Sequence, residues 1–440
     1  MIVSVRFNFR ELISLVGTLF LMVLLWFLYA ADLANFTIYI LLFLCLITLN
    51  FPKRFLSPLM FLYGYYGVFF VLAPMFAGRY SDKMGDNLYI LALAMSFSVL
   101  TFAVFGLYLG QKIIQTTELR SNFHFNTNKH YANRYSVLII IFMLYVAATT
   151  FIMLIVTSSG GLQYWLEAPG DAFLNRGGSG IYVVASHFFT YLLAVFSGYY
   201  AYKYKKFYYI VLFLIWLVMT SPVHGSKAQI SVFLILALLP WLKNVKPISL
   251  PSIFVSTSII IVFFAGLYFR NVSWISLDTF LPYALDYFTT LENLVISVRD
   301  FEPSFMTTFF LPFNKFTTIF GNPDMIYYDM NHYLTDIYFP QAWEIRATEQ
   351  WPVETDLYLN FGFFWGLPLI VLYFAIIGVF YSLALRLNGV GHWFISVLFM
   401  VWMVSHLRGS LYNHTDFYFY PMMIIMFYIT KNYSFEKKNR

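Results

Sequence analysis

Residues 88–109 read LYILALAMSFSVLTFAVFGLYL, a run of 22 residues without one charged side chain. A helix that crosses the hydrocarbon core of a bilayer needs about 20 such residues, so this run predicts a transmembrane helix. Similar runs recur along all 440 residues, 60% of which are hydrophobic and only 11% charged, with a mean hydropathy of +0.70. No soluble globular domain has this composition. The sequence therefore predicts an all-α polytopic membrane protein.

About twelve apolar runs are predicted to be transmembrane helices within a single integral membrane domain, residues 1–440. They are 11–30, 35–51, 58–77, 88–109, 135–157, 182–202, 207–221, 227–242, 252–269, 358–383, 391–408 and 416–431. The first run follows Arg6 and Arg10 and has no small-residue cleavage site, so we interpret it as a retained helix and not a cleaved signal. The single cysteine, Cys45, excludes an intramolecular disulfide.

Charge is sorted between the two sides of these spans. With the N-terminus placed inside, 18 of the 27 Lys and Arg residues fall in inner segments, whereas 18 of the 21 Asp and Glu residues fall outside. Short loops rich in Lys and Arg are typical of the cytoplasmic side, so we predict that both termini are cytoplasmic. The basic pI of about 9.0 reflects this topology. A nucleic-acid partner would require a clustered basic face on a soluble fold.

Two predicted outer loops are long. Loop 158–181 is the smaller, and loop 270–357, between the ninth and tenth spans, is far longer than an ordinary connection. The long loop is rich in aromatic and aliphatic residues, which a disordered segment lacks. Apolar residues at helical spacing predict an amphipathic helix over 280–299, lying on the outer leaflet or on the bundle. Stretch 305–320 is predicted to be a second interfacial piece, broken at Pro312.

Three cations stand alone at the outer ends of predicted spans: Lys227, Arg270 and Arg408. A Lys or Arg at the hydrocarbon edge costs free energy unless it snorkels or finds an anionic partner. Lys227 follows Gly225 and Ser226 at a predicted helix start, where free N–H groups also attract anions. We interpret the three cations as ligands of a lipid-linked pyrophosphate. Snorkelling and helix-end capping are the alternative interpretation.

The end of the long loop carries candidates for chemistry. Segment 343–362 mixes aromatic residues with four carboxylates and Arg346, a combination that suits sugar recognition. A carboxylate can bind a sugar hydroxyl or act as its general base. Glu354 is the predicted base, because it lies four residues before Tyr358 at the membrane edge, where desolvation raises a carboxylate pKa. A solvated acidic stretch is the alternative interpretation.

Other residues share the predicted site. His332 is a rival for the role of general base, and His414, in the last outer loop, is a weaker candidate. Tyr358, Arg346 and His224 are assigned to the acceptor sugar. For His224, an ordinary polar loop residue is the alternative.

Several catalytic signatures are absent from the sequence. It has no Asp-x-Asp metal motif, no His/Cys cluster, no phosphate-binding glycine loop and no GxSxG; the nearest pattern is Glu354-Thr355-Asp356. No charged residue falls in the middle third of a predicted span, where ion-coupled transporters usually need one. We therefore expect a reaction at the outer face that uses no metal, nucleotide or other cofactor.

In combination, these features resemble the O-antigen and oligosaccharide repeat-unit polymerases, the Wzy family. The layout of about twelve spans with a long, late outer loop carries part of the resemblance. Short motifs carry the rest: Gly225-Ser226-Lys227, Arg408-Gly409 and Glu354-x-x-x-Tyr358-x-Asn360-Phe361-Gly362-x-x-x-Gly366. Lys227 stands where the family pattern more often has arginine, which keeps the charge but loses the bidentate geometry.

The resemblance implies a GT-C type membrane glycosyltransferase in the bacterial inner (cytoplasmic) membrane, with its active site on the periplasmic face. It would transfer the growing glycan from undecaprenyl pyrophosphate to the non-reducing end of a new lipid-linked repeat unit. Its partners would be that lipid-linked oligosaccharide, membrane lipids and a chain-length regulator.

Two alternatives stay open. The O-antigen ligase has the same general layout and uses the same kind of donor, but its acceptor is lipid A–core. A flippase or transporter for the same lipid belongs to a different class and would be expected to have short, even loops and cations inside a central cavity. A structural scaffold would leave the outward cations unexplained.

Overall fold

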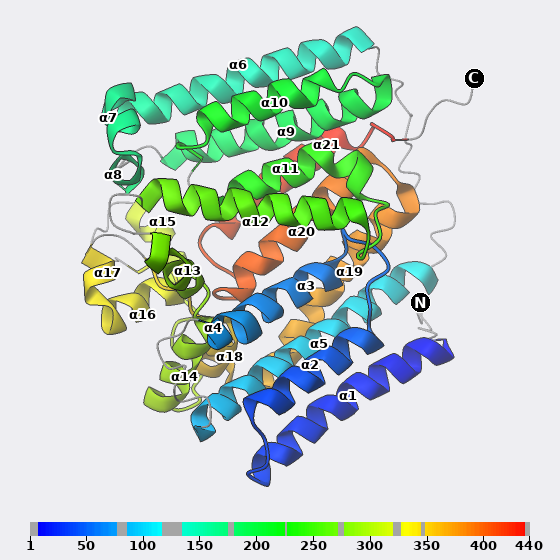
Figure 1. Ribbon diagram of the computed structural model, residues 1–440, viewed down its shortest axis with the longest axis vertical. Helices are drawn as coiled ribbons and strands as arrows, with labels where there is room; N and C mark the ends of the chain where they lie inside the picture. The colour runs from blue at the N-terminus through cyan, green and yellow to red at the C-terminus, as the bar shows by residue number, and fades with distance from the viewer. Residues whose placement is uncertain are drawn as a thin grey trace.

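The computed structural model describes residues 8–76, 86–116, 134–174, 180–224, 227–271, 277–319, 327–344 and 348–435. Within these ranges the chain is helical and forms no β-strand. Most of the long helices lie side by side and run in roughly the same direction or its reverse (Figure 1). Eight of the described helices are long and apolar enough to cross a membrane. The prediction of an all-α polytopic membrane protein is confirmed at this level.

The eight long helices match eight of the twelve predicted spans. They are α1 (Phe9–Ala30), the segment Pro58–Phe76, α5 (Asn87–Thr116), α6 (Arg134–Ser158), α9 (Gly180–Tyr204), α12 (Leu250–Asn271), α19 (Leu367–Leu387) and α20 (Val390–Leu407). The other four predicted spans coincide with helices of 13 to 16 residues: α2 (Phe36–Leu49), α10 (Tyr208–Thr220), α11 (Lys227–Leu242) and α21 (Asp416–Thr430). That these shorter helices also cross the membrane stays a prediction.

The tenth predicted span, 358–383, is not one helix, and this part of the prediction is wrong. The helix α18 (Val353–Phe361) ends at Gly362, where φ is 58°, and Phe363 follows with φ of 60°. Positive φ suits glycine but is strained for phenylalanine. A short 3₁₀ turn (Phe364–Gly366) then leads into α19. Gly362, Gly366 and Pro368 are the local signals of this turn, since glycine often ends a helix and proline often begins one.

Both long loops are built from short helices. Loop 158–181 contains α7 (Gly161–Glu167) and α8 (Pro169–Leu174). Loop 270–357 contains α13 (Leu277–Asp286), α14 (Thr290–Asp300), α15 (Asn314–Ile319), α16 (Met330–Tyr338), α17 (Pro340–Glu344) and the start of α18. Pro312 lies in a 3₁₀ turn ahead of α15, which agrees with the predicted break there.

The single helix predicted over 280–299 is wrong, because the chain turns at residues 287–289 and forms α13 and α14 instead. α14 is buried from Thr290 to Ser297 and packs against α5 and α18. The sequence predicted that this stretch lies either on the outer leaflet or on the helix bundle. The structure shows that α14 packs on the bundle.

Two hydrophobic cores divide the helices. The first core joins α1, α2, α3 (Pro58–Tyr66) and α5 to α14, α16, α18 and α19. The second core joins α6, α9, α10 and α11 to α21, and α19 and α20 contribute side chains to both cores. Within the described part of loop 270–357, every side chain that joins one of these two cores joins the first core. The long loop is therefore packed mainly onto one half of the molecule.

Helices α5 and α19 approach each other at backbone distance. A Cβ atom added to Gly106 would lie 2.5 Å from the carbonyl oxygen of Val371, and one added to Gly110 would lie 2.0 Å from that of Ala375. On the other helix, a Cβ at Gly378 would lie 2.5 Å from an α5 carbonyl oxygen. Glycines four residues apart are typical of closely packed membrane helices. Any larger side chain at these positions would force α5 and α19 apart.

The helix ends sort into two sides. α7, α8 and α13–α18 lie at one end of the bundle, which we call the outer end (Figure 1). At the opposite, inner end, Lys112 pairs with Glu11 at 2.8 Å and the Lys243 ammonium donates to Asn388 at 2.7 Å. Arg54 donates to the carbonyl oxygen of Lys243 at 3.1 Å. Lys112, Lys243 and Arg54 were all predicted to be cytoplasmic, and they lie at the end of the molecule opposite the long loop.

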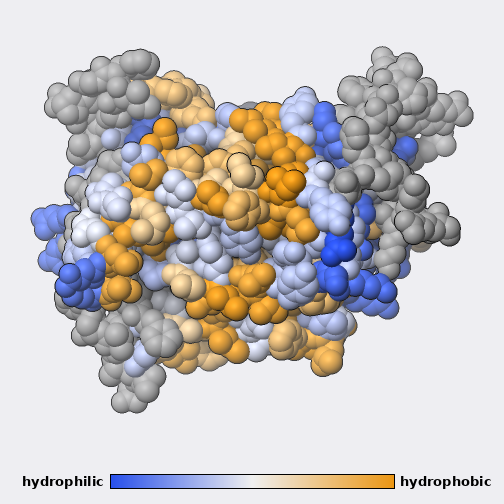
Figure 2. Space-filling view, turned by 90° about the horizontal axis from the view of Figure 1, so that it is seen from above, coloured by the Kyte–Doolittle hydropathy of each residue, from blue (hydrophilic) through white to orange (hydrophobic). Residues whose placement is uncertain are grey.

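One face of the molecule shows the same sorting by hydropathy. In Figure 2 the most hydrophilic residues lie toward the two ends of this face, with hydrophobic residues across the belt between them. Such a belt is expected where lipid tails surround a bundle. Which end faces the cytoplasm stays a prediction from the charge bias.

Candidate functional site

Glu354 lies in the first turn of α18, a helix whose side chains from Val353 to Asn360 are all buried. The Glu354 side chain has no exposed surface, and its Oε1 accepts a hydrogen bond of 2.8 Å from the hydroxyl of Tyr66. Burial raises the pKa of Glu354 to about 7, although the hydrogen bond from Tyr66 opposes this shift. The sequence predicted Glu354 at the membrane edge with partial desolvation; the structure encloses it completely.

Tyr66 is the last residue of α3, and the helix continues as a π-helical turn, η1 (Gly67–Leu72). π-helical turns occur frequently at functional sites. The preceding residue, Tyr65, donates a hydrogen bond of 2.6 Å to the carbonyl oxygen of Leu407, which ties α3 to the end of α20. Tyr65 is within electrostatic range of both the Glu354 carboxylate and the Arg408 guanidinium. The two charged groups therefore share Tyr65, whereas the hydrogen bond of Tyr66 goes to Glu354.

Arg408 follows the last turn of α20. Its guanidinium carbon lies 5.4 Å from the ring centroid of Phe69 in η1, and its Nε is buried with no hydrogen-bond partner in the described part of the chain. A guanidinium that rests on an aromatic face keeps its edge N–H groups free for an anion. Burial lowers the pKa of Arg408, but arginine stays protonated at neutral pH.

Two side chains fix the backbone at Arg408 and just after it. Asn331 donates to the carbonyl oxygen of Arg408 at 3.1 Å, and Asp356 accepts a hydrogen bond of 3.1 Å from the backbone N–H of Leu411. The other Asp356 oxygen accepts from Asn360 at 2.7 Å. Burial raises the pKa of Asp356 to about 6, but both of its oxygens are partnered. Asp356 therefore holds the loop in place, whereas Glu354 keeps one oxygen for other use.

Buried polar atoms without partners occur on the elements that surround Glu354. Among the described residues, Glu354 Oε2, Asn293 Oδ1, Trp351 Nε1 and Arg408 Nε make no hydrogen bond. An unsatisfied buried polar group costs about 1–3 kcal/mol, and nearly all such groups in folded proteins are satisfied. Asn293, on α14, is tied to the start of α18 through a 2.7 Å bond to the carbonyl oxygen of Gln350. Together these atoms provide donors, acceptors and a cation for a polar, anionic ligand.

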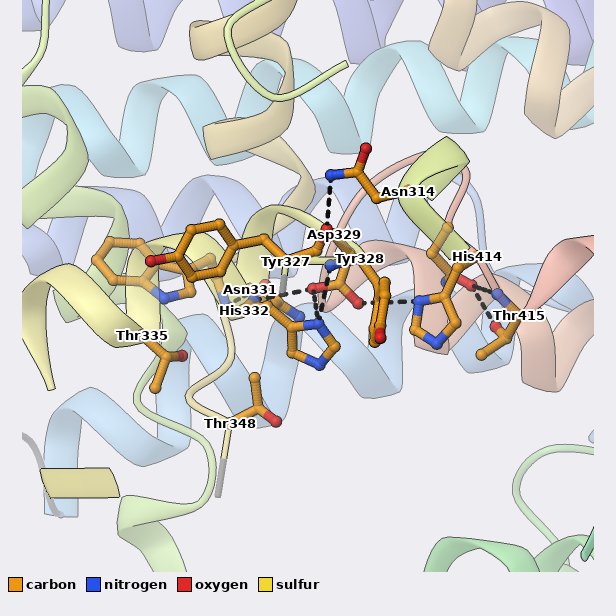
Figure 3. Close-up of polar contacts among 12 residues, drawn as sticks. Asn314, Tyr327, Tyr328, Asp329, Asn331, His332, Thr335, Thr348, His414 and Thr415 are labelled. Atoms are coloured by element: carbon orange, nitrogen blue, oxygen red, sulfur yellow. Dashed lines mark hydrogen bonds and ion pairs between the residues drawn. The ribbon is translucent and has the colours of Figure 1, made fainter. Parts of the chain in front are cut away.

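His332 lies in the first turn of α16, and the structure brings it together with His414 around Asp329 (Figure 3). Its Nδ1 is 3.7 Å from Asp329 Oδ1, and the Nδ1 of His414 is 3.5 Å from Asp329 Oδ2. The backbone N–H of Tyr328 donates to His332 Nδ1 at 3.3 Å. A neutral His332 that accepts at Nδ1 carries its proton on Nε2, which makes Nε2 a donor and not a base.

The predicted pyrophosphate ligands Lys227 and Arg270 are only partly described. α11 starts at Lys227 and α12 ends just after Arg270, both at the outer end (Figure 1). Their side chains, like the whole of Arg346, lie outside the described residues. The structure therefore places these two helix ends on the same side as Arg408.

Two predicted sugar contacts have other roles. His224 is only 2% exposed; its Nε2 is 2.9 Å from Thr220 Oγ1 and its ring packs against Phe233. Tyr358 is buried, and its hydroxyl donates to the carbonyl oxygen of Phe301 at 3.0 Å. These contacts do not support the assignment of either residue to the acceptor sugar.

Several residues of the site escaped sequence analysis. Tyr65 and Tyr66 stand in an apolar run of a chain that is 22% aromatic, so nothing in the sequence distinguishes them. A second missed group is buried where α19, α20 and α21 meet. There, His406 Nε2 lies 3.1 Å from Asp416 Oδ1, and His406 Nδ1 lies 2.7 Å from the hydroxyl of Tyr373. Its sequence signal is a histidine near the end of one span and an aspartate at the start of the next.

The described residues contain no group of three His, Cys, Asp or Glu side chains that could hold a metal ion. Comparison with known proteins gives no match: no family model, no curated protein and no solved structure corresponds to this chain. Any function must therefore be argued from the chemistry of the site itself.

Proposed function

We propose that this chain is a membrane glycosyltransferase that polymerises lipid-linked oligosaccharide repeat units. The observation that carries the proposal is that a buried carboxylate, Glu354, and a partly buried arginine, Arg408, both lie within electrostatic range of Tyr65 at the outer end. Ionisable groups with shifted pKa values in an enclosed site are typical of active sites. Their position at one end of an apolar bundle suits a substrate that is anchored in the membrane.

The proposed step joins two lipid-linked glycans. The oxygen of an acceptor hydroxyl, on the non-reducing sugar of a new repeat unit, attacks the anomeric carbon of the donor glycan. The bond between that carbon and the oxygen of undecaprenyl pyrophosphate breaks, and its electron pair leaves with the pyrophosphate. Glu354 Oε2 takes the hydroxyl proton, and Arg408 stabilises the charge on the leaving group.

Glu354 suits the role of general base better than His332. A general base works best with a pKa near the operating pH, and burial raises the pKa of Glu354 to about 7. Tyr66 holds Oε1 and leaves Oε2 without a partner among the described residues. His332, in contrast, accepts a hydrogen bond at Nδ1, so its Nε2 carries a proton when the ring is neutral.

Lys227 and Arg270 are proposed as further ligands of the donor pyrophosphate, since α11 starts and α12 ends at the outer end (Figure 1). Several cations are expected around a leaving pyrophosphate, which gains negative charge in the transition state. The proposal includes twelve spans in a GT-C-like arrangement in the bacterial inner membrane. Both termini are then cytoplasmic, the site is periplasmic, and a chain-length regulator is the expected protein partner.

The experiment that tests the function is a deletion of the gene followed by gel analysis of the surface glycan. A strain that lacks a polymerase retains a single repeat unit on its surface lipid. A strain that lacks a ligase or a flippase retains none. Long glycans in the deletion strain would exclude all three activities. Complementation with the native chain and with Glu354→Gln then relates the glycan pattern to the site.

A further inference from the structure

Asp329 contacts two histidines that come from different parts of the outer end (Figure 3). His332 belongs to α16, whereas His414 lies in the loop between α20 and α21. Asp329 Oδ1 accepts the backbone N–H of His332 at 2.9 Å, and its two oxygens lie 3.7 Å and 3.5 Å from the Nδ1 atoms of the two rings. Because both rings turn Nδ1 toward one carboxylate, both turn Nε2 away from it.

The two Nε2 atoms have opposite hydrogen-bonding character. His332 accepts the N–H of Tyr328 at Nδ1, so its neutral ring presents Nε2 as a donor. His414 turns Nδ1 toward Asp329 Oδ2 at 3.5 Å, and the tautomer that carries its proton on Nδ1, facing this carboxylate, presents Nε2 as an acceptor. Neither Nε2 has a hydrogen-bond partner among the described residues, and the two side chains are 20% and 18% exposed. One donor and one acceptor side by side match hydroxyl groups, which both donate and accept.

Neutral rings are consistent with the surroundings of His332. Burial lowers the pKa of His332, and the charges of His414 and Lys315 lower it further, whereas Asp329 opposes the shift. At neutral pH the ring of His332 is therefore uncharged. A neutral imidazole at His332 favours a neutral polar ligand over a second anion.

Aromatic rings flank the two imidazoles. The ring centroid of Tyr328 lies 5.8 Å from that of His332 and 5.6 Å from that of His414. Trp343 lies 5.4 Å from His332 on the α16–α17 side. Aromatic surfaces combined with a few polar atoms are typical of small-molecule sites, and aromatic faces pack well against the C–H faces of sugar rings. The surroundings therefore favour a saccharide as the ligand.

Asn331 connects this cluster to Arg408. Its Nδ2 donates to the carbonyl oxygen of Arg408 at 3.1 Å, and its Oδ1 accepts the N–H of Trp351 at 3.2 Å. Asn331 is the neighbour of His332 in the chain, and His414 follows Arg408 by six residues. A sugar held by the two histidines would therefore lie next to the segments that carry Arg408 and Glu354.

We infer that His332 and His414, oriented by Asp329, form a saccharide-binding subsite for the acceptor repeat unit. This inference rests on the proposed function, because it names where that function binds its acceptor. His332 donates to one sugar hydroxyl and His414 accepts from another. The two histidines position the acceptor, and Glu354 remains the proton acceptor.

The test measures binding of the repeat-unit oligosaccharide, released from its carrier lipid by mild acid, to the purified full-length protein in lipid nanodiscs. Titration calorimetry compares the native chain with His332→Phe, His414→Phe and Asp329→Asn. Phenylalanine keeps a ring of similar shape and removes both ring nitrogens. Asparagine can still accept the N–H of His332, so the start of α16 is kept. His224→Phe is the matched control, since it changes a buried histidine in the other half of the molecule.

We expect the dissociation constant to rise about tenfold in each of the three variants, as for one lost hydrogen bond, and less than about twofold in the control. In the extension reaction, KM for the acceptor should rise by a similar factor while kcat changes less than about threefold. Unchanged binding in both histidine variants would overturn the subsite, and so would a native protein that does not bind the oligosaccharide. The proposed function is contradicted by a different result, which is the presence of long glycans in the deletion strain.

Discussion

The two hydrophobic cores differ in how their outer ends treat buried ionisable groups. At the end of the second core, His224 is enclosed by Trp216 and Phe233, and burial together with His187 lowers its pKa to about 3. That histidine is uncharged at any physiological pH. At the end of the first core, Arg408 keeps its charge, and burial raises the pKa of Glu354 to about 7. One Glu354 oxygen makes no hydrogen bond to any residue that the structure describes. The difference supports our proposal that the chemistry takes place in the half that carries the long loop.

The largest effect is expected for Glu354→Gln, which preserves the shape of the side chain and removes the base. Turnover should fall about 100- to 10,000-fold, the usual contribution of general base catalysis, with a smaller change in acceptor binding. Extension of lipid-linked repeat units by the purified protein measures this. Glu302→Gln, at an exposed position, is the control and should be as active as the native chain. If Glu354→Gln extended glycans at the native rate, the proposed chemical difference between the outer ends of the two cores would be wrong.

Arg408→Ala should have the next largest effect. Loss of a charge-assisted contact to the leaving pyrophosphate costs about 2–4 kcal/mol, or about 30- to 1,000-fold in rate. Arg386→Ala provides the control, because that arginine lies at the inner end and donates to the carbonyl oxygen of Ile114. Long glycans should be lost with Arg408→Ala and kept with Arg386→Ala, at equal protein levels on an immunoblot. Equal glycan patterns would exclude a role for Arg408 in the reaction.

The raised pKa of Glu354 also predicts a dependence of stability on pH. The unfolded chain ionises this carboxyl near pH 4.5, whereas the folded chain resists ionisation until about pH 7. The stability that Glu354 contributes is therefore present below pH 4.5 and is lost as the pH rises through 7. Above pH 7, Glu354→Gln should be more stable than the native chain by about 3 kcal/mol. Melting temperatures in detergent between pH 4 and pH 8 test this, and parallel curves for the two proteins would contradict it.

The smallest effect on activity is expected for His224→Gln, which should extend glycans within about twofold of the native rate. Its effect is on acid stability, because the folded chain keeps His224 neutral while the unfolded chain protonates it below about pH 6.5. At pH 5 the native chain should lose about 2 kcal/mol relative to the variant. The same melting curves measure this. A large loss of activity in His224→Gln would show that the second core also takes part in the chemistry.

The sequence was enough to predict the helices, because long uncharged runs such as 88–109 admit few other structures. It did not predict the turn at Gly362 and Phe363. That turn is stabilised by distant backbone contacts, among them the hydrogen bond from Gly362 to the carbonyl oxygen of Ser304. The local sequence around Gly362 does not indicate which distant residue this backbone contact will involve.

The candidate site was partly predictable for a similar reason. Arg408 stands out in the sequence as an isolated charge beside an apolar run, and Glu354 as a carboxylate close to the start of a predicted span. Tyr66, the partner of Glu354, lies 288 residues away in the chain, and only the packing of α3 against α18 brings the two together. His332 was predicted as a rival base from its residue type alone. The N–H of Tyr328 gives it the opposite hydrogen-bonding role, which no spacing pattern could show.

The glycine contacts between α5 and α19 have a consequence for the path that a lipid tail can take. Gly106, Gly110 and Gly378 place backbone against backbone, so no acyl chain can pass between these two helices without separating them. α12, in contrast, buries only 17% of its most apolar stretch and ends at the outer side near α13. We expect a carrier lipid to approach from the side of α12. The three glycines thus close the contact between α5 and α19, and under the proposed function the exposed side of α12 is where a carrier lipid would reach the site.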